Sequence, residues 1–232
     1  MNFDIHSGAY SPSGHDAPPE TRGDERAASG GDAAKAVFDR CFSVLALLFF
    51  APFLIVISLV ILLGDGGPIL FRHKRIGRDG RIFNCLKFRT MANDAEERLK
   101  AILDTDPKAR AEWDANQKLE DDPRITCIGE FFRKTSLDEL PQFWNVLRGE
   151  MSVVGPRPIV AEEAHHYGEH FKDYLSVRPG VTGLWQVMGR SRTTYDERVA
   201  MDIDYVRNRS FRMDIWIILK TIKVMLVRDG AC

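Results

Sequence analysis

The hydrophobic pattern of the chain is dominated by one long apolar run. From Cys41 to Gly64, 24 consecutive residues carry no charge. A helix of that length measures roughly 36 Å, against roughly 30 Å for the hydrocarbon core of a bilayer. A helix buried in a soluble domain, the alternative, would show a polar face, and this run has none. The pattern therefore predicts a membrane helix.

Pro52 lies at the twelfth of these positions and predicts a break in the helix, because proline removes a backbone hydrogen bond. Each half then matches one leaflet. Lys35 and Arg40 precede the run, and five basic residues follow it between positions 72 and 81. Since positive charge favours the cytoplasmic side, we expect a re-entrant helix over 35–64, with a kinked single span as the alternative.

The next stretch has the alternating pattern of a β-hairpin. ILFRHKRI and RIFNCLKFRTM flank a turn that contains Asp79 and Gly80. A period of two puts Lys87 and Arg89 on one face, opposite the face of Phe88. The two cations could decorate a solvated edge strand, or they could bind lipid headgroups or a phosphate-bearing substrate.

Helical patterns dominate the rest of the chain. Residues 93–119 are highly charged, are interrupted at Pro107 and suggest no chemistry. Residues 213–227 are apolar on most faces, which fits either a core helix or an amphipathic helix in the membrane interface. The expected fold is α+β and mostly helical: a monotopic membrane protein with a proline-broken re-entrant helix, a short β-hairpin and amphipathic interfacial helices.

Composition and charge separate the first 34 residues from the rest. They hold six acidic and two basic residues, and twelve positions are Gly, Ser or Pro, so 1–34 is expected to be a disordered acidic tail. This start lacks the pattern of a signal peptide, so export is not expected, and residues 65–232 should form a cytoplasmic domain. Overall, 32 basic and 33 acidic residues argue against a polybasic coat for nucleic acid.

Candidate chemistry centres on two adjacent carboxylates, Asp138 and Glu139. Ser136 and Glu139 fit a capping box at a helix start, which leaves Asp138 unexplained. One carboxylate could bind a divalent cation while the other attacks an electrophile.

Two loops stiffened by proline add polar groups. In Gly155–Pro158, the flanking prolines hold Arg157 in a fixed orientation that suits a phosphate or a carboxylate. In Arg178–Gln186, Trp185 and Gln186 could contact a base or a sugar. Together with the KFRTM strand, these loops suit a diphosphate and a metal ion.

Several long motifs occur in the same order as in a known family. FRHKRIG, KFRTM, DPRIT, RKTSLDELPQFWNVLRGEMSVVGPRP and RPGVTGLWQV resemble the motif series of the bacterial sugar transferase family, the monotopic polyprenyl-phosphate phosphoglycosyl transferases. The likeness runs from about Lys35 to Ile222 and is greatest to the small members that initiate exopolysaccharides. One departure is Ala51-Pro52, where family members often have Ser-Pro.

The resemblance implies transfer of galactose or glucose 1-phosphate from a UDP-sugar to undecaprenyl phosphate, at the cytoplasmic face of the inner membrane, with release of UMP. It implies that Asp138 is the nucleophile, forming a covalent phosphosugar, and that Glu139 binds Mg²⁺. The residues implied to contact phosphates or nucleotide are Lys87, Arg89, Arg157, Gln186 and Arg190. A membrane-tethered nucleotide-sugar hydrolase and a non-catalytic membrane interaction protein remain as alternatives.

Overall fold

The computed structural model describes residues 24–116, 119, 121–189 and 193–227. The chain divides into two units, Met1–Ala34 and Lys35–Cys232, and the architecture below is that of the second. It is mostly helical, as the sequence predicted, and it contains the predicted hairpin and a second small sheet that was not predicted. Its elements are α1 (Asp24–Asp65), β1 (Leu70–Ile76), β2 (Ile82–Phe88), α2 (Ala95–Thr105), α3 (Pro107–Asn116), α4 (Cys127–Thr135), α5 (Gln142–Leu147), β3 (Ser152–Val154), α6 (Phe171–Leu175), β4 (Gly180–Thr182), α7 (Leu184–Met188), α8 (Tyr195–Asn208) and α9 (Phe211–Val227), with short 3-10 segments at Arg78–Gly80, Leu137–Glu139 and Ala161–His170.

The long apolar run forms helix α1, which is long and apolar enough to cross a membrane over Gly31–Gly64. Most side chains in this apolar part of α1 are exposed in the structure, so α1 is not the core helix of a soluble domain. Near its end, Ile57 and Ile61 pack against Phe88 of β2 and Phe132 of α4. The apolar helix is therefore packed on the rest of the unit along one face, and its other faces are exposed.

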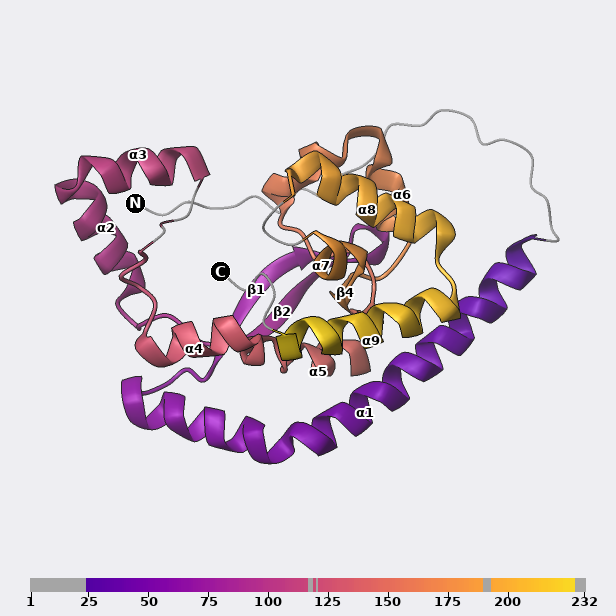
Figure 1. Cartoon of the computed structure of the whole chain (residues 1–232), viewed down its shortest axis with the longest axis horizontal. Coiled ribbons are helices and arrows are strands. Elements are labelled where there is room, and N and C mark those ends of the chain that lie inside the picture. The colour runs from indigo at the N-terminus through magenta and orange to yellow at the C-terminus, as the bar shows by residue number, and fades with distance from the viewer. Residues whose placement is uncertain (1–23, 117–118, 120, 190–192, 228–232) are drawn as a thin grey trace. The chain divides into compact units, whose positions relative to one another are not determined.

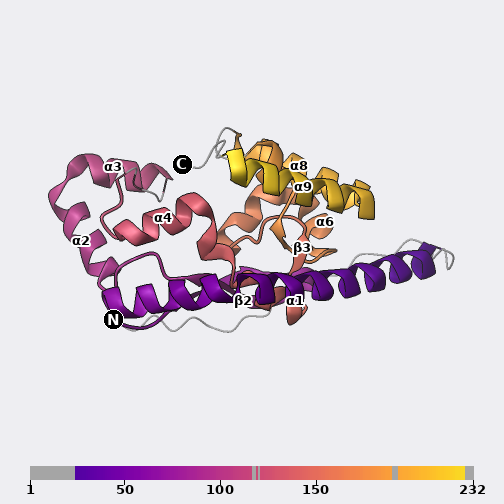
Figure 2. The same cartoon turned by 60° about the horizontal axis from the view of Figure 1, so that its bottom comes forward.

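Pro52 does not divide α1 into two helices, because the helix is continuous through that residue. Figure 1 shows α1 bending within its apolar part, and Figure 2, turned by 60°, shows the same helix nearly straight. The bend therefore lies mainly in one plane. A proline inside a helix removes one backbone hydrogen bond and crowds the preceding turn, and the other bonds hold the two sides together as one bent element.

The first turns of α1 fall within the stretch expected to be disordered. From Asp24 to Ala34 the chain is helical in the structure. The rest of that stretch, 1–23, lies outside the described residues.

Two short sheets organise the domain. β1 and β2 form the predicted antiparallel hairpin, with Phe71 opposite Lys87 and Ile76 opposite Ile82. β3 and β4 pair in parallel, with Ser152 beside Gly180 and Val154 beside Thr182. Because parallel strands run in the same direction, the loops that follow β3 and β4 leave the sheet at the same end.

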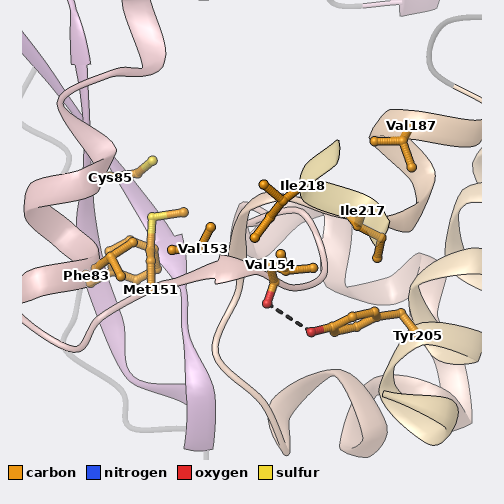
Figure 3. Close-up of a cluster of buried hydrophobic side chains, with 10 residues drawn as sticks. Phe83, Cys85, Met151, Val153, Val154, Val187, Tyr205, Ile217 and Ile218 are labelled. Atoms are coloured by element: carbon orange, nitrogen blue, oxygen red, sulfur yellow. Dashed lines mark hydrogen bonds between the residues drawn. The ribbon is translucent and has the colours of Figure 1, made fainter. Parts of the chain in front are cut away.

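The main hydrophobic core joins β2, β3 and the C-terminal helices. Its side chains include Phe83 and Cys85 from β2, Val154 from β3 and Ile217 from α9 (Figure 3). The hydroxyl group of Tyr205 on α8 donates a hydrogen bond to the carbonyl oxygen of Val154 at 3.0 Å, drawn dashed in Figure 3. This core fixes the strand that leads into the Gly155–Pro158 turn.

Helix α9 is partly buried in the core and partly exposed, so its place in the core is confirmed for one face and an interfacial role for the other stays a prediction. Ile217 and Ile218 are buried in the core, whereas Leu219, Ile222 and Leu226 are exposed. One face of the helix therefore packs in the domain while another presents large apolar side chains at the surface.

Candidate active site

The carboxylate pair sits in a tight turn between α4 and α5. Asp138 and Glu139 belong to the 3-10 segment Leu137–Glu139. Ser136 makes the bend that precedes it, with a left-handed φ of +56° that is unfavourable for a residue with a side chain. Single strained residues of this kind cluster at functional sites. The capping box predicted for Ser136 is wrong, because its side chain makes no capping hydrogen bond and the residue instead follows the last turn of α4.

Glu139 is held by a cation and an amide. The ammonium group of Lys87 donates a hydrogen bond to Oε1 of Glu139 at 2.7 Å. The buried side chain of Gln142, one turn further on, also hydrogen-bonds this carboxylate. Burial would raise the pKa of Glu139, but the charges of Lys87 and Arg157 and these hydrogen bonds outweigh it and lower the pKa. Glu139 is therefore ionised at neutral pH.

The pKa of Asp138 is shifted in the opposite direction. The residue is 8% exposed, and burial, reinforced by the neighbouring charge of Glu139, raises the pKa of Asp138 to about 6. Lys87 and Arg133 act against this shift and keep the carboxylate able to ionise near neutral pH. Two adjacent acids with pKa values shifted in opposite directions are typical of paired catalytic carboxylates with different roles.

The Gly155–Pro158 turn brings Arg157 to this site, where its charge acts on Glu139. The guanidinium group of Arg157 lies over the ring of Trp185, 5.4 Å from the centroid. The carbonyl oxygen of Arg157 accepts a hydrogen bond from the hydroxyl group of Tyr174 at 3.3 Å. The arginine is thus fixed through both its backbone and its side chain.

The two proline-stiffened loops lie together, as the parallel pairing of β3 and β4 requires. The N–H of Gly155 donates to the carbonyl oxygen of Thr182 at 2.9 Å, and the N–H of Gly180 donates to that of Pro156 at 2.8 Å. A Cβ atom on Gly180 would lie 2.1 Å from the backbone nitrogen of Gly155. Glycine is therefore needed for this close approach.

For three other residues with predicted roles, the structure shows no contact with the carboxylate pair among the residues that it describes. Arg89 donates to the backbone carbonyl oxygens of Gly66 and Gly67 and to Asn93, so these contacts tie it to the join after α1. Gln186 lies on α7, and its amide donates to the carbonyl oxygen of Val181 in its own loop at 3.5 Å. Arg190 lies outside the described residues. Their roles in substrate binding remain predictions.

Two residues at the site were missed from the sequence. Gln142 follows Glu139 by three positions, so helical spacing could have indicated that the two side chains meet. Arg133 lies at the start of the motif that contains the carboxylate pair, and its charge acts on Asp138. Its Nε donates to the hydroxyl group of Thr90 at 2.9 Å, a contact that no local pattern reveals.

The donor atoms of the carboxylate pair fit a magnesium ion. Mg²⁺ prefers oxygen ligands and is commonly held by one or two carboxylates together with substrate phosphates and water. Among the described residues, no group of three or more His, Cys, Asp or Glu side chains gathers around a common point. Glu139, with Asp138 beside it, offers carboxylate oxygens of the kind that Mg²⁺ prefers, and the magnesium site stays a prediction.

Comparisons with known proteins point to one family of enzymes. The family model described as bacterial sugar transferase matches residues 31–228. The chain is 54% identical over 197 residues to an uncharacterized sugar transferase of Haemophilus influenzae, covering 85% of this chain and 42% of the relative. It is 50% identical to the undecaprenyl-phosphate galactose phosphotransferase of Salmonella typhimurium, covering 85% of this chain and 41% of the relative.

A third relative is of similar length. The chain is 45% identical over 213 residues to the exopolysaccharide production protein ExoY of Rhizobium meliloti, covering 92% of this chain and 93% of the relative. The chain thus spans about two fifths of the length of the first two relatives and nearly all of the third.

Proposed function

Because the chain belongs to the bacterial sugar transferase family, as its motifs indicated, we propose that it is a phosphoglycosyl transferase. It transfers galactose or glucose 1-phosphate from a UDP-sugar to undecaprenyl phosphate, the first membrane step of exopolysaccharide synthesis. The observation that carries this proposal is the pairing of buried Asp138 with ionised Glu139 under the charges of Lys87, Arg133 and Arg157. A protein that only docks on lipid needs the cations but has no need of the paired acids.

The reaction proceeds in two displacements at one phosphorus atom. An oxygen of the Asp138 carboxylate attacks the sugar-bearing phosphorus of the UDP-sugar, forming an aspartyl phosphosugar as the bond to the bridging oxygen breaks. UMP leaves with that oxygen. A phosphate oxygen of undecaprenyl phosphate then attacks the same phosphorus atom, the bond to Asp138 breaks, and undecaprenyl-diphosphate sugar is released.

Burial of Asp138 supports its role as the nucleophile. A carboxylate with its pKa raised to about 6 is weakly solvated, yet it is mostly ionised at pH 7 and above. Attack by an anion on a diphosphate must overcome charge repulsion, which fixed cations near the reacting oxygens reduce. Lys87 and Arg157 supply such cations in this site.

Glu139 would hold Mg²⁺, with Asp138 beside it. When bound, the ion neutralises charge on the diphosphate oxygens. Gln142 and Lys87 orient the Glu139 carboxylate through hydrogen bonds. Arg157, stacked on Trp185, would bind a phosphate group at the edge of the same site.

The lipid acceptor explains the apolar surface of the domain. We place the protein at the cytoplasmic face of the inner membrane, with α1 re-entrant and bent at Pro52. Basic residues flank both ends of its apolar run, and its side chains are largely exposed. The exposed apolar faces of α4, with Ile128 and Phe131, and of α9 would lie in the interface as amphipathic helices.

The decisive experiment compares Asp138→Asn with the wild-type enzyme in membranes that contain undecaprenyl phosphate. The variant should remain folded and membrane-bound, but with UDP-[¹⁴C]galactose or UDP-[¹⁴C]glucose and Mg²⁺ it should form no radiolabelled protein and release no UMP. Glu139→Gln should be strongly impaired in the same assay, with part of the loss recovered at higher Mg²⁺ concentration.

Two outcomes would contradict the proposal. Product formation by Asp138→Asn at a rate comparable with wild type would exclude the covalent mechanism. Release of free sugar phosphate at the same rate with and without undecaprenyl phosphate would identify a nucleotide-sugar hydrolase instead.

A further inference from the structure

Asn145 lies on α5, outside the carboxylate turn, and its buried side chain makes several hydrogen bonds. The residue is 0% exposed. Its side-chain oxygen accepts a hydrogen bond from the N–H of Leu86 at 3.0 Å, and its amide nitrogen donates to the carbonyl oxygen of Asn84 at 2.8 Å. The same nitrogen donates to Oε2 of Glu150 at 2.6 Å. The amide group is therefore bound at both its oxygen and its nitrogen.

The bonds to Leu86 and Asn84 take the place of the backbone hydrogen bonds that a neighbouring strand would make to this edge of β2. β1 pairs with one edge of β2, and the N–H of Leu86 and the C=O of Asn84 belong to residues two apart, which face the same edge of a strand. The side-chain amide of Asn145 satisfies both groups, as a backbone amide of a neighbouring strand would. Buried backbone groups left unpaired are costly, so this contact fixes the position of β2.

The contact lies between the two segments that carry the Lys87–Glu139 pair. Leu86 directly precedes Lys87, whose ammonium group lies 2.7 Å from Oε1 of Glu139. On the other side, α5 begins at Gln142, whose side chain hydrogen-bonds the Glu139 carboxylate. Asn145 lies on that same short helix. One amide thus joins the strand of the cation to the helix that follows the acid.

We propose that Asn145 is a positioning residue that holds Lys87 against Glu139, and that Glu150 orients the Asn145 amide. This inference rests on the proposed function, because it takes the Lys87–Glu139 pair to be part of the active site. Without the amide, β2 is no longer hydrogen-bonded to α5, and Lys87 can move away from the carboxylate of Glu139. A misplacement of about 1 Å at a reacting centre can lower the rate about 100-fold.

The test is a double-mutant cycle on the full chain in membranes, with UMP release from the UDP-hexose that the wild type uses as the readout. Lys87→Met and Asn145→Ala should each lower kcat, and the double variant should be no slower than Lys87→Met within about twofold, because both changes remove the same interaction. Asn208→Ala is the matched control: its amide donates to Asp204 at 2.7 Å on the exposed face of α8, and its loss should leave kcat unchanged.

A second pair of variants covers the case in which Asn145→Ala does not fold. Asn145→Asp keeps the size of the side chain but places a carboxylate oxygen where the amide nitrogen donated to Glu150 and to the carbonyl oxygen of Asn84. Adding Glu150→Gln supplies a donor in its place, so the double variant should recover about tenfold or more of the activity lost in Asn145→Asp. A residue that only fills space would show no such rescue.

The outcomes separate the inference from the function on which it rests. If Lys87→Met is slow but the effects of Lys87→Met and Asn145→Ala multiply, and Glu150→Gln gives no rescue, Asn145 does not act through Lys87 and the inference is wrong. If Lys87→Met is as active as the wild type, the Lys87–Glu139 pair is not part of the active site, and the proposed function itself requires revision.

Discussion

Oδ1 of Asp39 accepts a hydrogen bond from the backbone N–H of Val153 at 3.1 Å, although the two residues are 114 positions apart. Asp39 is 2% exposed and lies on α1, just before the apolar run. Val153 lies in β3, two residues before the Gly155–Pro158 turn. The part of α1 that precedes its apolar run is therefore bonded to the strand that carries Arg157 into the site.

An ion pair reinforces this junction. Lys35 donates to Oδ2 of Asp214 at 2.7 Å, and the hydroxyl group of Tyr205 donates to Oδ1 of Asp214 at 2.7 Å. Tyr205 also contacts the carbonyl oxygen of Val154. α1, α8 and α9 thus meet at β3 through buried polar contacts.

Replacing Asp39 with leucine should destabilise the domain and lower its activity. The substitution leaves the buried N–H of Val153 without its acceptor, which costs about 1–3 kcal/mol. We expect faster loss of transferase activity on heating in membranes and a lower initial rate. Cys41→Ala, at an exposed position on the same helix, is the control and should match the wild type. Unchanged heat resistance and turnover in Asp39→Leu would show that the bond to Val153 is dispensable.

Gly180→Ala should disrupt the two loops at the site. Its Cβ atom would lie 2.1 Å from the backbone nitrogen of Gly155, so one of the two backbones must shift. Because Arg157 follows Gly155 by two residues, UMP release should fall about 100-fold while the protein stays in the membrane. Gly64→Ala is the matched control, since nothing lies within 4 Å of its added Cβ atom. Near wild-type activity in Gly180→Ala would mean that the backbones of Gly155 and Gly180 can move apart without displacing Arg157.

The parts of the fold that the sequence predicted depend on local periodicity. The uncharged run predicted the apolar part of α1, and the alternating pattern around Asp79–Gly80 predicted the β1–β2 hairpin. Both signals are contained in the residues that form the element. The pairing of β3 with β4 joins segments far apart in the chain, so periodicity could not reveal it. Only the kinds of residue in the two loops and the motif resemblance suggested that they share one site.

One error arises because a local pattern fits two conformations. Ser136 and Glu139 have the spacing of a capping box, but the same serine can adopt the left-handed conformation that ends a helix, and here it does. Tertiary contacts decide this case. β2 ends at Phe88, and the guanidinium group of Arg89 binds the backbone of Gly66, so the role of Arg89 in substrate binding stays a prediction.

Arg133→Gln should move the acid limb of the pH–rate profile to higher pH. Burial and the charge of Glu139 raise the pKa of Asp138 to about 6, and Arg133 acts against this rise. The nucleophile must be ionised, so activity is present above this pKa and is lost as the pH falls through it. Removing a nearby positive charge raises the pKa further. Profiles of kcat/KM for UMP release, at constant Mg²⁺ concentration, measure the shift.

Arg133→Lys is the control for this experiment, because it keeps the positive charge near Asp138. Its acid limb should lie closer to that of the wild type than the limb of Arg133→Gln does. An acid limb in Arg133→Gln that is unmoved, or that lies at lower pH, would show that Arg133 does not influence the ionisation of the attacking group.

Pro52→Leu should lower activity without releasing the protein from the membrane. Leucine restores the backbone N–H that proline lacks, and that group can donate to the carbonyl oxygen of Leu48, one turn earlier. The bend in α1 should then relax toward a straight helix long enough to span the bilayer. A spanning α1 would pull apart the two ends that the domain holds, at Asp39 on one side and at Ile57 and Ile61 on the other.

Cysteine labelling can determine whether α1 re-enters or spans the membrane. In a chain without its four cysteines, new cysteines at Gly30 and Arg78 should both resist an impermeant thiol reagent on intact cells, since a re-entrant helix keeps both ends inside. With Pro52→Leu added, one of them should become reactive from outside. If one site already reacts in the chain that retains Pro52, α1 spans the membrane, and the flanking charges have been misinterpreted. If Pro52→Leu keeps both the labelling pattern and full turnover, the contacts of Asp39, Ile57 and Ile61 hold the bend without the proline.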